Sequence, residues 1–452
     1  MWLLFKKKFI KLLKYIFETT FPEYVKVKIS YLLDPLPKNR LRATVSIRAE
    51  NYFQACKEEL KKKDKNSKHH YLHTAFKKHL VRSSLIDDNW WSDFIKLIDL
   101  PDGAEFEQIN KSLIDRIEDY NFNSLEHFEI LDIYSLCIRF SLYDLGFYLR
   151  QKSLRIALDY PLPLKDNESW KLKTKLSALL EIGNFNEFDQ LLPLFASRKN
   201  KEIYFLKYLR EVLGNSKTSE FKSSIIIKDS EQDLNFSKFI ENKKIVIVSP
   251  SPVNIKDGIK IDNADVVVRT NYKPGETLIK GNRCDVNYVN LHKALDVEKN
   301  GYPDWSLDTK WLIVKGWNYI EIILNKLSSD GISIKNLNFR AIEKFDNALF
   351  YGNLLVLPHI IIDLLRRNPK EIYLYHFDAM LSLRRISGYF PKNTKDEKSA
   401  LIKGNVGHDP VINFIILKSF WMKGFIKGDH ILEKVMKMEI EDYMKKLQKN
   451  YR

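Results

Sequence analysis

A turn of two serines and two prolines, residues 249–252, follows the β-branched run Ile-Val-Ile-Val at residues 245–248. A continuous apolar run of this kind is typical of a strand that is buried on both faces, as in parallel sheets. At the end of the first strand of an α/β domain, a glycine-rich turn commonly lets the backbone approach a phosphate. Proline has no N–H group to offer, whereas the hydroxyls of Ser249 and Ser251 can donate and accept hydrogen bonds. The pattern therefore leaves open a nucleotide site in altered form or a plain turn.

Polar residues also stand directly after the later runs that we expect to be strands. Parallel strands place their carboxyl ends at one edge of a sheet, and ligands bind beyond that edge. His408 lies in the sequence Gly-His-Asp-Pro before a long apolar run, so we expect it at or beside the amino terminus of a helix. The polar residues after the strands are Arg269, Thr270 and Asn271, then Asn290 and His292, then His376 and Asp378.

The elements that must position these residues change in character along the chain. The N-terminal half carries apolar residues at helical spacing, and Gly183-Asn184 has the pattern of the turn in a helical hairpin. After a polar, serine-rich stretch, apolar β-branched runs alternate with helical patterns, which predicts a parallel sheet. We expect strands at 245–249, 265–271, 285–290, 311–316 and 371–378, and one long helix at 348–367.

The expected fold class is therefore α/β. A doubly wound, mostly parallel, Rossmann-like sheet is expected in the C-terminal half, after an all-α domain. No fixed period recurs in that all-α domain, so the pattern leaves open whether its helices form true repeats. The expected divisions are a basic amphipathic helix at 1–22, the all-α domain at 23–215, a linker at 216–242, the Rossmann-like domain at 243–430 and a basic C-terminal helix at 431–452.

The charge of the chain favours an acidic partner. Its 452 residues carry a formal net charge of +16, which suits anionic lipid, nucleotide phosphates, a polyanionic glycan or nucleic acid. No nucleic-acid-binding module is recognisable, so we do not expect nucleic acid as a partner. Cys56, Cys137 and Cys284 are odd in number and far apart, which argues against a disulfide framework and favours a reducing cytoplasm.

Residues 1–17 have the pattern of a helix that lies on a membrane surface. Apolar residues, among them Trp2, Phe5 and Phe17, share one arc of this helix, and five lysines flank it. Lysines interrupt every apolar run, so we expect neither a secretory signal nor a membrane span here. The alternative is a first helix that docks on its own domain with a solvated lysine face. The favoured interpretation places the protein in the cytoplasm, peripheral to the inner face of the plasma membrane.

Several histidines have a plain structural interpretation. His69, His70 and His73 lie in a basic segment, where a solvated face is the expectation rather than a metal cluster. His359 lies on an otherwise apolar helix and is expected to be a core histidine with its hydrogen bonds satisfied. For His376 and His292 the pattern does not decide between a role in the site and a structural role.

The ordered set of these motifs resembles the sialyltransferases of glycosyltransferase families 42 and 29. The set runs from the turn through "NADVVVRTNY" and "IKGNRCDVNYVN" to "KEIYLYHFD" and "GHDPVINF", over about residues 243–421. This resemblance implies one doubly wound sheet that binds a CMP-activated sugar without a metal ion and inverts the anomeric centre on transfer. It implies no cofactor beyond the donor substrate itself.

The resemblance assigns roles at a limited number of positions. It implies that the turn at 249–253 holds the donor, and that His408 is the general base that takes the proton of the acceptor hydroxyl. A helix amino terminus would disfavour the imidazolium form and keep this base free. The expected donor-binding residues are Ser249, Ser251, Arg269, Asn271, Asn290, Gly352, Asn353 and Asp378.

The sequence also departs from the pattern of these families. The turn is usually rich in glycine and asparagine, and here it holds serine and proline. The tyrosines that stabilise the leaving phosphate in family 42 have no positional match. Arg384, Arg385 and Tyr389 are the nearby candidates for that role, because a departing phosphate needs charge stabilisation, and of these Arg384 or Tyr389 is the favoured choice.

The resemblance to these families, added to the patterns, implies a metal-independent, inverting glycosyltransferase. It would transfer sialic acid or a Kdo-type 2-keto sugar acid from its CMP donor to a surface glycan or glycolipid. Its expected partners are the nucleotide-sugar donor, the glycan acceptor and an anionic membrane surface that residues 1–17 would contact. The alternative is a non-catalytic, membrane-associated scaffold with helical repeats and a degenerate nucleotide-sugar fold, which the altered turn and the missing tyrosines favour and the retained Gly-His pair opposes.

Overall fold

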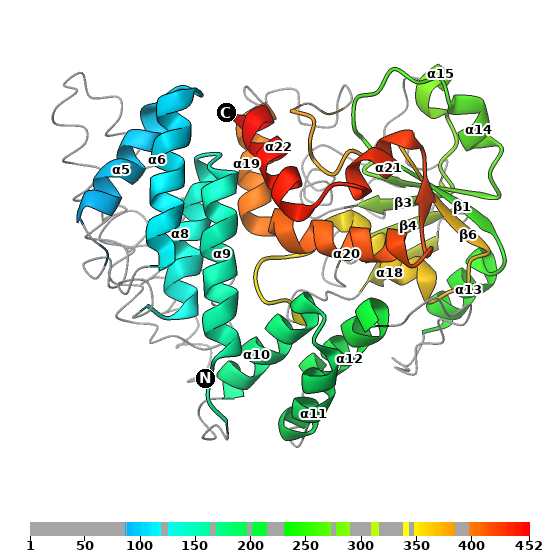
Figure 1. The fold of residues 1–452 in the computed structure, drawn as a ribbon. Helices are drawn as coiled ribbons and strands as arrows, with labels where there is room; N and C mark the ends of the chain where they lie inside the picture. Colours follow the sequence, from blue (N-terminus) through cyan, green and yellow to red (C-terminus); the bar gives the residue numbers. More distant parts are fainter. Residues whose placement is uncertain are drawn as a thin grey trace, which may run out of the picture. The chain divides into compact units, whose positions relative to one another are not determined.

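The structure is a computed structural model, and Figure 1 shows its fold. The chain divides into two compact units, Met1–Ile156 and Ala157–Arg452, which are described one at a time. The expected helix at 1–22 and the histidines at 69, 70 and 73 lie outside the described residues. The described residues are Ile86, 88–118, 125–162, 169–196, 201–214, 230–272, 277–289, 309–315, 338–342, 348–383, Arg385 and 397–452.

The first unit is helical in its described part. Trp90, Trp91 and Phe94 share the buried side of its first described helix, and the rings of Trp90 and Phe94 stack with centroids 5.3 Å apart. The indole N–H of Trp90 donates to the carbonyl of Leu113, so two helices are joined by a hydrogen bond as well as by packing. The helices are α5 (Asp88–Asp99), α6 (Ala104–Asp115), the 3₁₀ helix η2 (Arg116–Glu118), α8 (His127–Arg139) and α9 (Tyr143–Leu158).

In its described part, the second unit begins with four helices, of which the first three pack against one another and the fourth contacts a strand of the sheet. Gly183 has a φ of 75° and ends the first of them, so the predicted helical hairpin at Gly183-Asn184 is present. Tyr208 donates to the carbonyl of Ile362 over 3.0 Å, and Lys423 donates to that of Val212 over 2.9 Å. These contacts join the helix at 201–214 to the segments at 356–365 and 410–423 of the same compact unit, and the expected domain boundary at residue 215 stays a prediction. The helices are α10 (Ser169–Ile182), α11 (Phe185–Ala196), α12 (Lys201–Gly214) and α13 (Glu231–Ile240).

The sheet of the second unit has seven parallel strands in the order β5-β4-β3-β2-β1-β6-β7. This confirms the α/β class. In the central register Val246 of β1 lies between Val267 of β2 and Tyr373 of β6. The order runs in one direction from β1 to β5 and in the other from β1 to β6 and β7, so it reverses between β1 and β6. The strands are β1 (Lys244–Val248), β2 (Val266–Thr270), β3 (Val286–Val289), β4 (Trp311–Lys315), β5 (Asn338–Ile342), β6 (Glu371–Tyr375) and β7 (Lys427–Gly428).

Helices of the second unit pack beside this sheet, and α14 and α15 lie side by side near the end of β1 (Figure 1). The long helix expected at 348–367 is shorter, because it begins only at Val356. Gly352 has a φ of 73°, and a Cβ atom there would lie 2.5 Å from that of Asp409, so the preceding segment is not helical. The helices are α14 (Gly258–Asp262), α15 (Thr277–Lys280), α18 (Val356–Leu365), α19 (Glu397–His408), α20 (Pro410–Met422), α21 (His430–Met436) and α22 (Ile440–Tyr451).

A buried ion pair joins β5 to α18. The guanidinium of Arg340 donates to both carboxylate oxygens of Asp363, over 2.5 and 2.7 Å, and its Nε donates to Asp233 of α13. The hydroxyl of Tyr288 in β3 donates to the same Asp363. Burial acts to raise the pKa of Asp363, but the charge and hydrogen bonds of Arg340 outweigh it and hold that pKa below its usual value. Within the described residues, no helix has the length and apolar character needed to cross a membrane.

Candidate ligand-binding site

A cavity lies where the strand order reverses, at the carboxyl ends of β1, β2 and β6. Open parallel sheets commonly bind ligands at this position. The cavity has a volume of about 80 Å³, which is room for several water molecules. Its polar lining residues are Ser249, Ser251, Thr270, Asp378 and Arg385, and its apolar ones are Ile247, Val248, Pro250, Leu355, Val356, Leu357, Leu374, Phe377 and Met380.

The turn after β1 is joined to the loop after β6 by hydrogen bonds. The backbone N–H of Ser249 donates to the carbonyl of Tyr375 over 3.0 Å, which extends the pairing of β1 with β6 by one residue. The hydroxyls of Ser249 and Ser251 lie 3.0 Å apart, and that of Ser251 donates to Asp378 Oδ1 over 2.7 Å. The predicted residues Ser249, Ser251 and Asp378 are therefore brought together around one cavity.

A buried lysine that we did not predict holds this turn. Lys280, the last residue of α15, donates through Nζ to the carbonyls of Ser249 and Ser251, over 2.8 and 2.5 Å. Each of these carbonyls precedes a proline, so the turn accepts hydrogen bonds where a glycine-rich turn would donate them. The lysine lies some thirty positions after the turn, and only the packing of α15 against α14 places it here.

The loop after β6, residues 376–383, has an unusual backbone. His376, Ala379 and Met380 have φ values of 60°, 49° and 69°, a region in which residues other than glycine are strained. Asp378 stabilises the loop from within, because its carboxylate accepts the backbone N–H groups of Met380 and Ser382 over 3.2 and 2.9 Å. Strain of this kind is common at binding sites and persists only where surrounding contacts hold it.

Arg385 contributes a positively charged group to the cavity wall. It is buried, it donates to the carbonyl of Ser382 over 3.1 Å, and it contacts the sulfur of Met380. A guanidinium group in such a position can bind a phosphate or carboxylate with two parallel hydrogen bonds. We expected this residue only as one of three alternatives near the end of the loop. The other two, Arg384 and Tyr389, lie outside the described residues.

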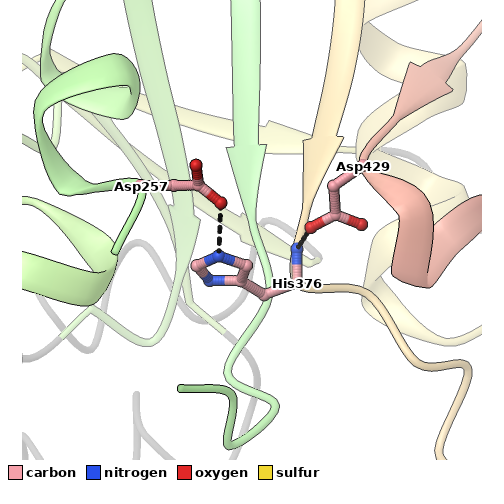
Figure 2. A group of neighbouring side chains, drawn as sticks. All are labelled: Asp257, His376 and Asp429. Carbon is pink, nitrogen blue, oxygen red and sulfur yellow. Dashed lines mark hydrogen bonds and ion pairs between the residues drawn. The ribbon is translucent and has the colours of Figure 1, made fainter. Parts of the chain in front are cut away.

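Three buried side chains fix the start of the loop after β6 (Figure 2). The imidazole Nε2 of His376 lies 3.3 Å from Asp257 Oδ2, and the backbone N–H of His376 donates to Asp429 over 2.6 Å. The potential metal-ligating atoms of these residues lie within 4.8 Å of one another, so the group could hold a divalent cation. Both carboxylates already have partners, since Asp429 caps α21 and Asp257 also binds Lys260. These contacts explain the group without a metal ion, because Asp257 and Asp429 hold the side chain and the backbone of His376 in its strained conformation.

The charges in this group follow from burial and neighbours. Burial lowers the pKa of His376, and the charge of Lys280 lowers it further, although Asp257 acts in the opposite direction. Burial acts to raise the pKa of Asp257, but hydrogen bonds from Lys260 and His376 hold it below its usual value. At neutral pH His376 is therefore a neutral imidazole beside a carboxylate.

Two predicted donor-binding residues, Arg269 within β2 and Asn271 just after it, make hydrogen bonds to the surrounding backbone. Arg269 is buried, and its guanidinium donates to the backbone carbonyls of Lys280, Gly281 and Arg283. The backbone N–H of Asn271 donates to the carbonyl of Tyr288 over 2.9 Å. Neither residue lines the cavity, whereas their neighbour Thr270 does. Successive side chains of a strand point to opposite faces, and Thr270, which lines the cavity, stands between the two predicted residues Arg269 and Asn271.

His408, Gly352 and Asn353 form a second group near the first. The N–H of Asn353 donates to the carbonyl of Gly407 over 3.0 Å, and Gly352 approaches Asp409 closely. His408 is the last residue of α19, and Asp409 caps α20, so His408 lies between a carboxyl and an amino helix end. The amino end of α20 disfavours the imidazolium form of His408, as expected, but the carboxyl end of α19 favours it. The helix dipoles therefore do not by themselves keep this base neutral.

No residue of this second group lines the cavity, although Leu355, two places after Asn353, does. The side-chain amide of Asn413 links α20 to the segment 353–355. Its oxygen accepts the N–H of Leu355 over 2.7 Å, and its nitrogen donates to the carbonyl of Asn353 over 3.1 Å. Asn290 and His292 lie outside the described residues. His359 is buried on α18 and its Nδ1 lies 3.0 Å from the carbonyl of Leu355, which fits the expected core histidine.

Comparison with known proteins adds no relative. No protein-family model matches the chain, and no match was found among curated proteins or solved structures. The site must therefore be interpreted from its own chemistry, which is a cavity with hydroxyl, carboxylate and guanidinium groups over an apolar wall.

Proposed function

We propose that the second unit is a metal-independent glycosyltransferase domain that binds a CMP-activated 2-keto sugar acid. One observation carries the proposal: the residues predicted from separate motifs, Ser249, Ser251 and Asp378, meet at one cavity where the strand order reverses. This is where doubly wound, Rossmann-like sheets bind nucleotides. The resemblance of the motif order to the sialyltransferases of families 42 and 29 supplies the choice of donor.

The lining suggests a role for each side of the cavity. The apolar wall that includes Val248, Leu374 and Phe377 suits a pyrimidine ring, which needs desolvation and packing. Thr270 and the two serines suit ribose or sugar hydroxyls, which both donate and accept. Arg385 suits the phosphate that leaves with the nucleotide, because its charge would stabilise the developing anion.

His408 is the proposed general base. The link from Gly407 through Asn353 to the cavity wall at Leu355 supports this placement, because it puts the histidine on a segment attached to the site. The acceptor hydroxyl would lose its proton to the imidazole as it attacks the anomeric carbon, and CMP would leave. The acceptor would be a surface glycan or glycolipid, and residues 1–17 would hold the protein at the inner face of the plasma membrane.

A donor-turnover assay on the full chain tests this function. CMP release from CMP-sialic acid and from CMP-Kdo is measured with and without a glycan acceptor, in the presence of a chelator. We expect release from one of the two donors that the chelator does not abolish. His408→Asn should lower the rate by about 100-fold or more without weakening donor binding, whereas the exposed His430→Asn should leave it unchanged. Loss of activity on chelation, or full activity in His408→Asn, would contradict the proposal.

The second candidate function is a scaffold with a degenerate nucleotide-sugar fold. The cavity favours it in one respect, because its volume of about 80 Å³ is below the roughly 300 Å³ at which ordinary ligand pockets begin. The hydroxyl of Ser251 is also already engaged with Asp378. A protein that is folded, yet binds none of CMP, UDP and GDP, would support the scaffold.

A further inference from the structure

The C-terminal helix α22 contacts the loop after β6 through a row of hydrogen bonds. The hydroxyl of Tyr443 donates to the carbonyl of Ala379 over 2.8 Å, and that of Tyr451 to the carbonyl of Met380 over 2.9 Å. The side-chain amide of Asn450 donates to the carbonyl of Leu381 over 2.7 Å. Three successive carbonyls of the loop thus each have a donor from one helix.

These three carbonyls belong to the part of the loop with the unusual backbone. Ala379 and Met380 have φ values of 49° and 69°, and neither is glycine. A backbone of this kind persists only where contacts over-determine it. The hydrogen bonds from α22 act on the outer side of the loop, while the carboxylate of Asp378 accepts its N–H groups on the inner side.

The helix itself is firmly anchored. Tyr443, Met444, Leu447 and Tyr451 form its buried stripe at helical spacing, and the ring of Tyr443 stacks on Phe414 of α20 with centroids 4.3 Å apart. Burial raises the pKa of Tyr451 to about 12, so its hydroxyl remains a donor at neutral pH. The helix therefore presents fixed donors to the loop.

We propose that Tyr443, Asn450 and Tyr451 of α22 are positioning residues that hold the loop after β6 in the shape that presents Asp378 and Arg385 to a ligand. This inference rests on the proposed function, because it assumes that the cavity binds a ligand. It adds to that function a role for the C-terminal helix α22. Residues 431–452, expected as one basic helix, instead span the two helices α21 and α22, and α22 would then belong to the support of the site.

The second unit offers a matched control for the test. Tyr208 is also a buried tyrosine whose hydroxyl donates to a backbone carbonyl, that of Ile362, over 3.0 Å. Tyr443→Phe, Tyr451→Phe and Tyr208→Phe each remove one such hydrogen bond and keep the ring. If these tyrosines only stabilise the unit as a whole, all three variants should raise its amide exchange to a similar extent. If Tyr443 and Tyr451 position the loop, only their variants should raise exchange in the loop after β6.

Hydrogen–deuterium exchange on the full-length protein separates these predictions. The backbone N–H groups of residues 380–382 are hydrogen-bonded to Asp378, so their exchange reports the loop. In the double variant Tyr443→Phe/Tyr451→Phe we expect their exchange to rise by about tenfold or more, with the strands of the sheet unchanged. Tyr208→Phe should leave the loop as it is. Equal exchange at residues 380–382 in all variants would overturn the proposal, and so would a uniform rise across the unit.

Nucleotide affinity provides the second measurement. CMP binding to the double variant should weaken by about tenfold or more, while Tyr208→Phe should retain wild-type affinity. If the double variant does not fold, the partly exposed Asn450→Ala takes its place in both measurements. Failure of wild type to bind any nucleotide would count against the proposed function alone, because the exchange result still decides whether α22 holds the loop.

Discussion

Ser251 donates a hydrogen bond from its hydroxyl to the carboxylate of Asp378 over 2.7 Å, although the two residues lie 127 positions apart in the chain. The bond joins the turn after β1 to the loop after β6. These two strands are neighbours in the sheet, and the strand order reverses between them. Through it, the two sides of the cavity share one hydrogen-bond network.

Asp378→Asn should destabilise the second unit. The NH₂ group of asparagine cannot accept a hydrogen bond. If it takes the place of Oδ2, the N–H of Ser382 loses its acceptor, and if it takes the place of Oδ1, the N–H of Met380 loses its acceptor. The expected cost is about 1–3 kcal/mol in the free energy of unfolding, measured by urea denaturation. Asp442→Asn, an exposed position on α22, is the matched control and should stay within about 0.5 kcal/mol of wild type. Equal stability of the two variants would show that Asp378 does not hold the loop.

Lys280→Met should loosen the turn after β1. Methionine keeps most of the buried chain but removes the ammonium group that satisfies the carbonyls of Ser249 and Ser251. We expect a loss of about 1.5–3 kcal/mol in stability, together with faster amide exchange in the turn. The exposed Lys434→Met is the control. A Lys280→Met protein that matches this control in both measurements would mean that the turn keeps its shape unaided.

Arg340→Met should cost more than either change, about 3–5 kcal/mol, because it leaves the buried Asp363 without its ion pair. The double variant Arg340→Met/Asp363→Leu should recover much of that loss, since no unpaired charge then remains in the core. The measurement is a double-mutant cycle of chemical denaturation, with the exposed Lys370→Met as control. Additive losses in the double variant would rule out a coupled pair.

His127 should make the first unit sensitive to acid. Burial lowers the pKa of His127 to about 3, whereas an unfolded histidine titrates near about 6.5. The stabilisation from its neutral form is complete above pH of about 6.5 and is lost as the pH falls from there towards about 3, because only the unfolded chain takes up the proton. The intrinsic rate of amide exchange itself falls with the pH, so the expected effect is a decrease in the protection factors of the α8 amides, that is, in the ratio of the intrinsic to the observed exchange rate.

The variant His127→Leu should flatten this acid dependence, and the exposed His430→Leu should not. Protection factors of the α8 amides, corrected for the intrinsic exchange rate at each pH, are compared between pH 7 and pH of about 4.5 for the full-length wild type and both variants. An unchanged slope in His127→Leu would assign the acid sensitivity to other groups.

Much of the sheet could be predicted from the sequence because β1 and β2 carry uninterrupted β-branched runs, and because β3, β4 and β6 are short segments rich in aliphatic and aromatic residues. β1, β2, β3, β4 and β6 lie at the expected positions. β5 was missed because Arg340 interrupts its apolar pattern, and the buried carboxylate that explains this arginine lies elsewhere in the sequence. β7 has two residues, too few for any periodicity to appear.

The site could be predicted to the level of the sheet edge but not to that of side-chain contacts. Position after a strand correctly grouped Ser249, Ser251 and Asp378. It could not show that Arg269 turns towards the carbonyls of residues 280–283, since the conformation of a long side chain depends on packing. Lys280 carried no signal of its own, because its role arises only once α15 packs beside α14.

Calorimetric titration of the full-length protein with CMP, with UDP and GDP in parallel and a chelator present, tests the central claim most directly. We predict that CMP binds, that the other two nucleotides bind at least about tenfold more weakly, and that Ser251→Ala weakens CMP while the control Ser419→Ala, on α20, does not. A folded protein that takes up none of the three, or equal CMP affinity in Ser251→Ala and wild type, would contradict a donor site at the ends of β1 and β6.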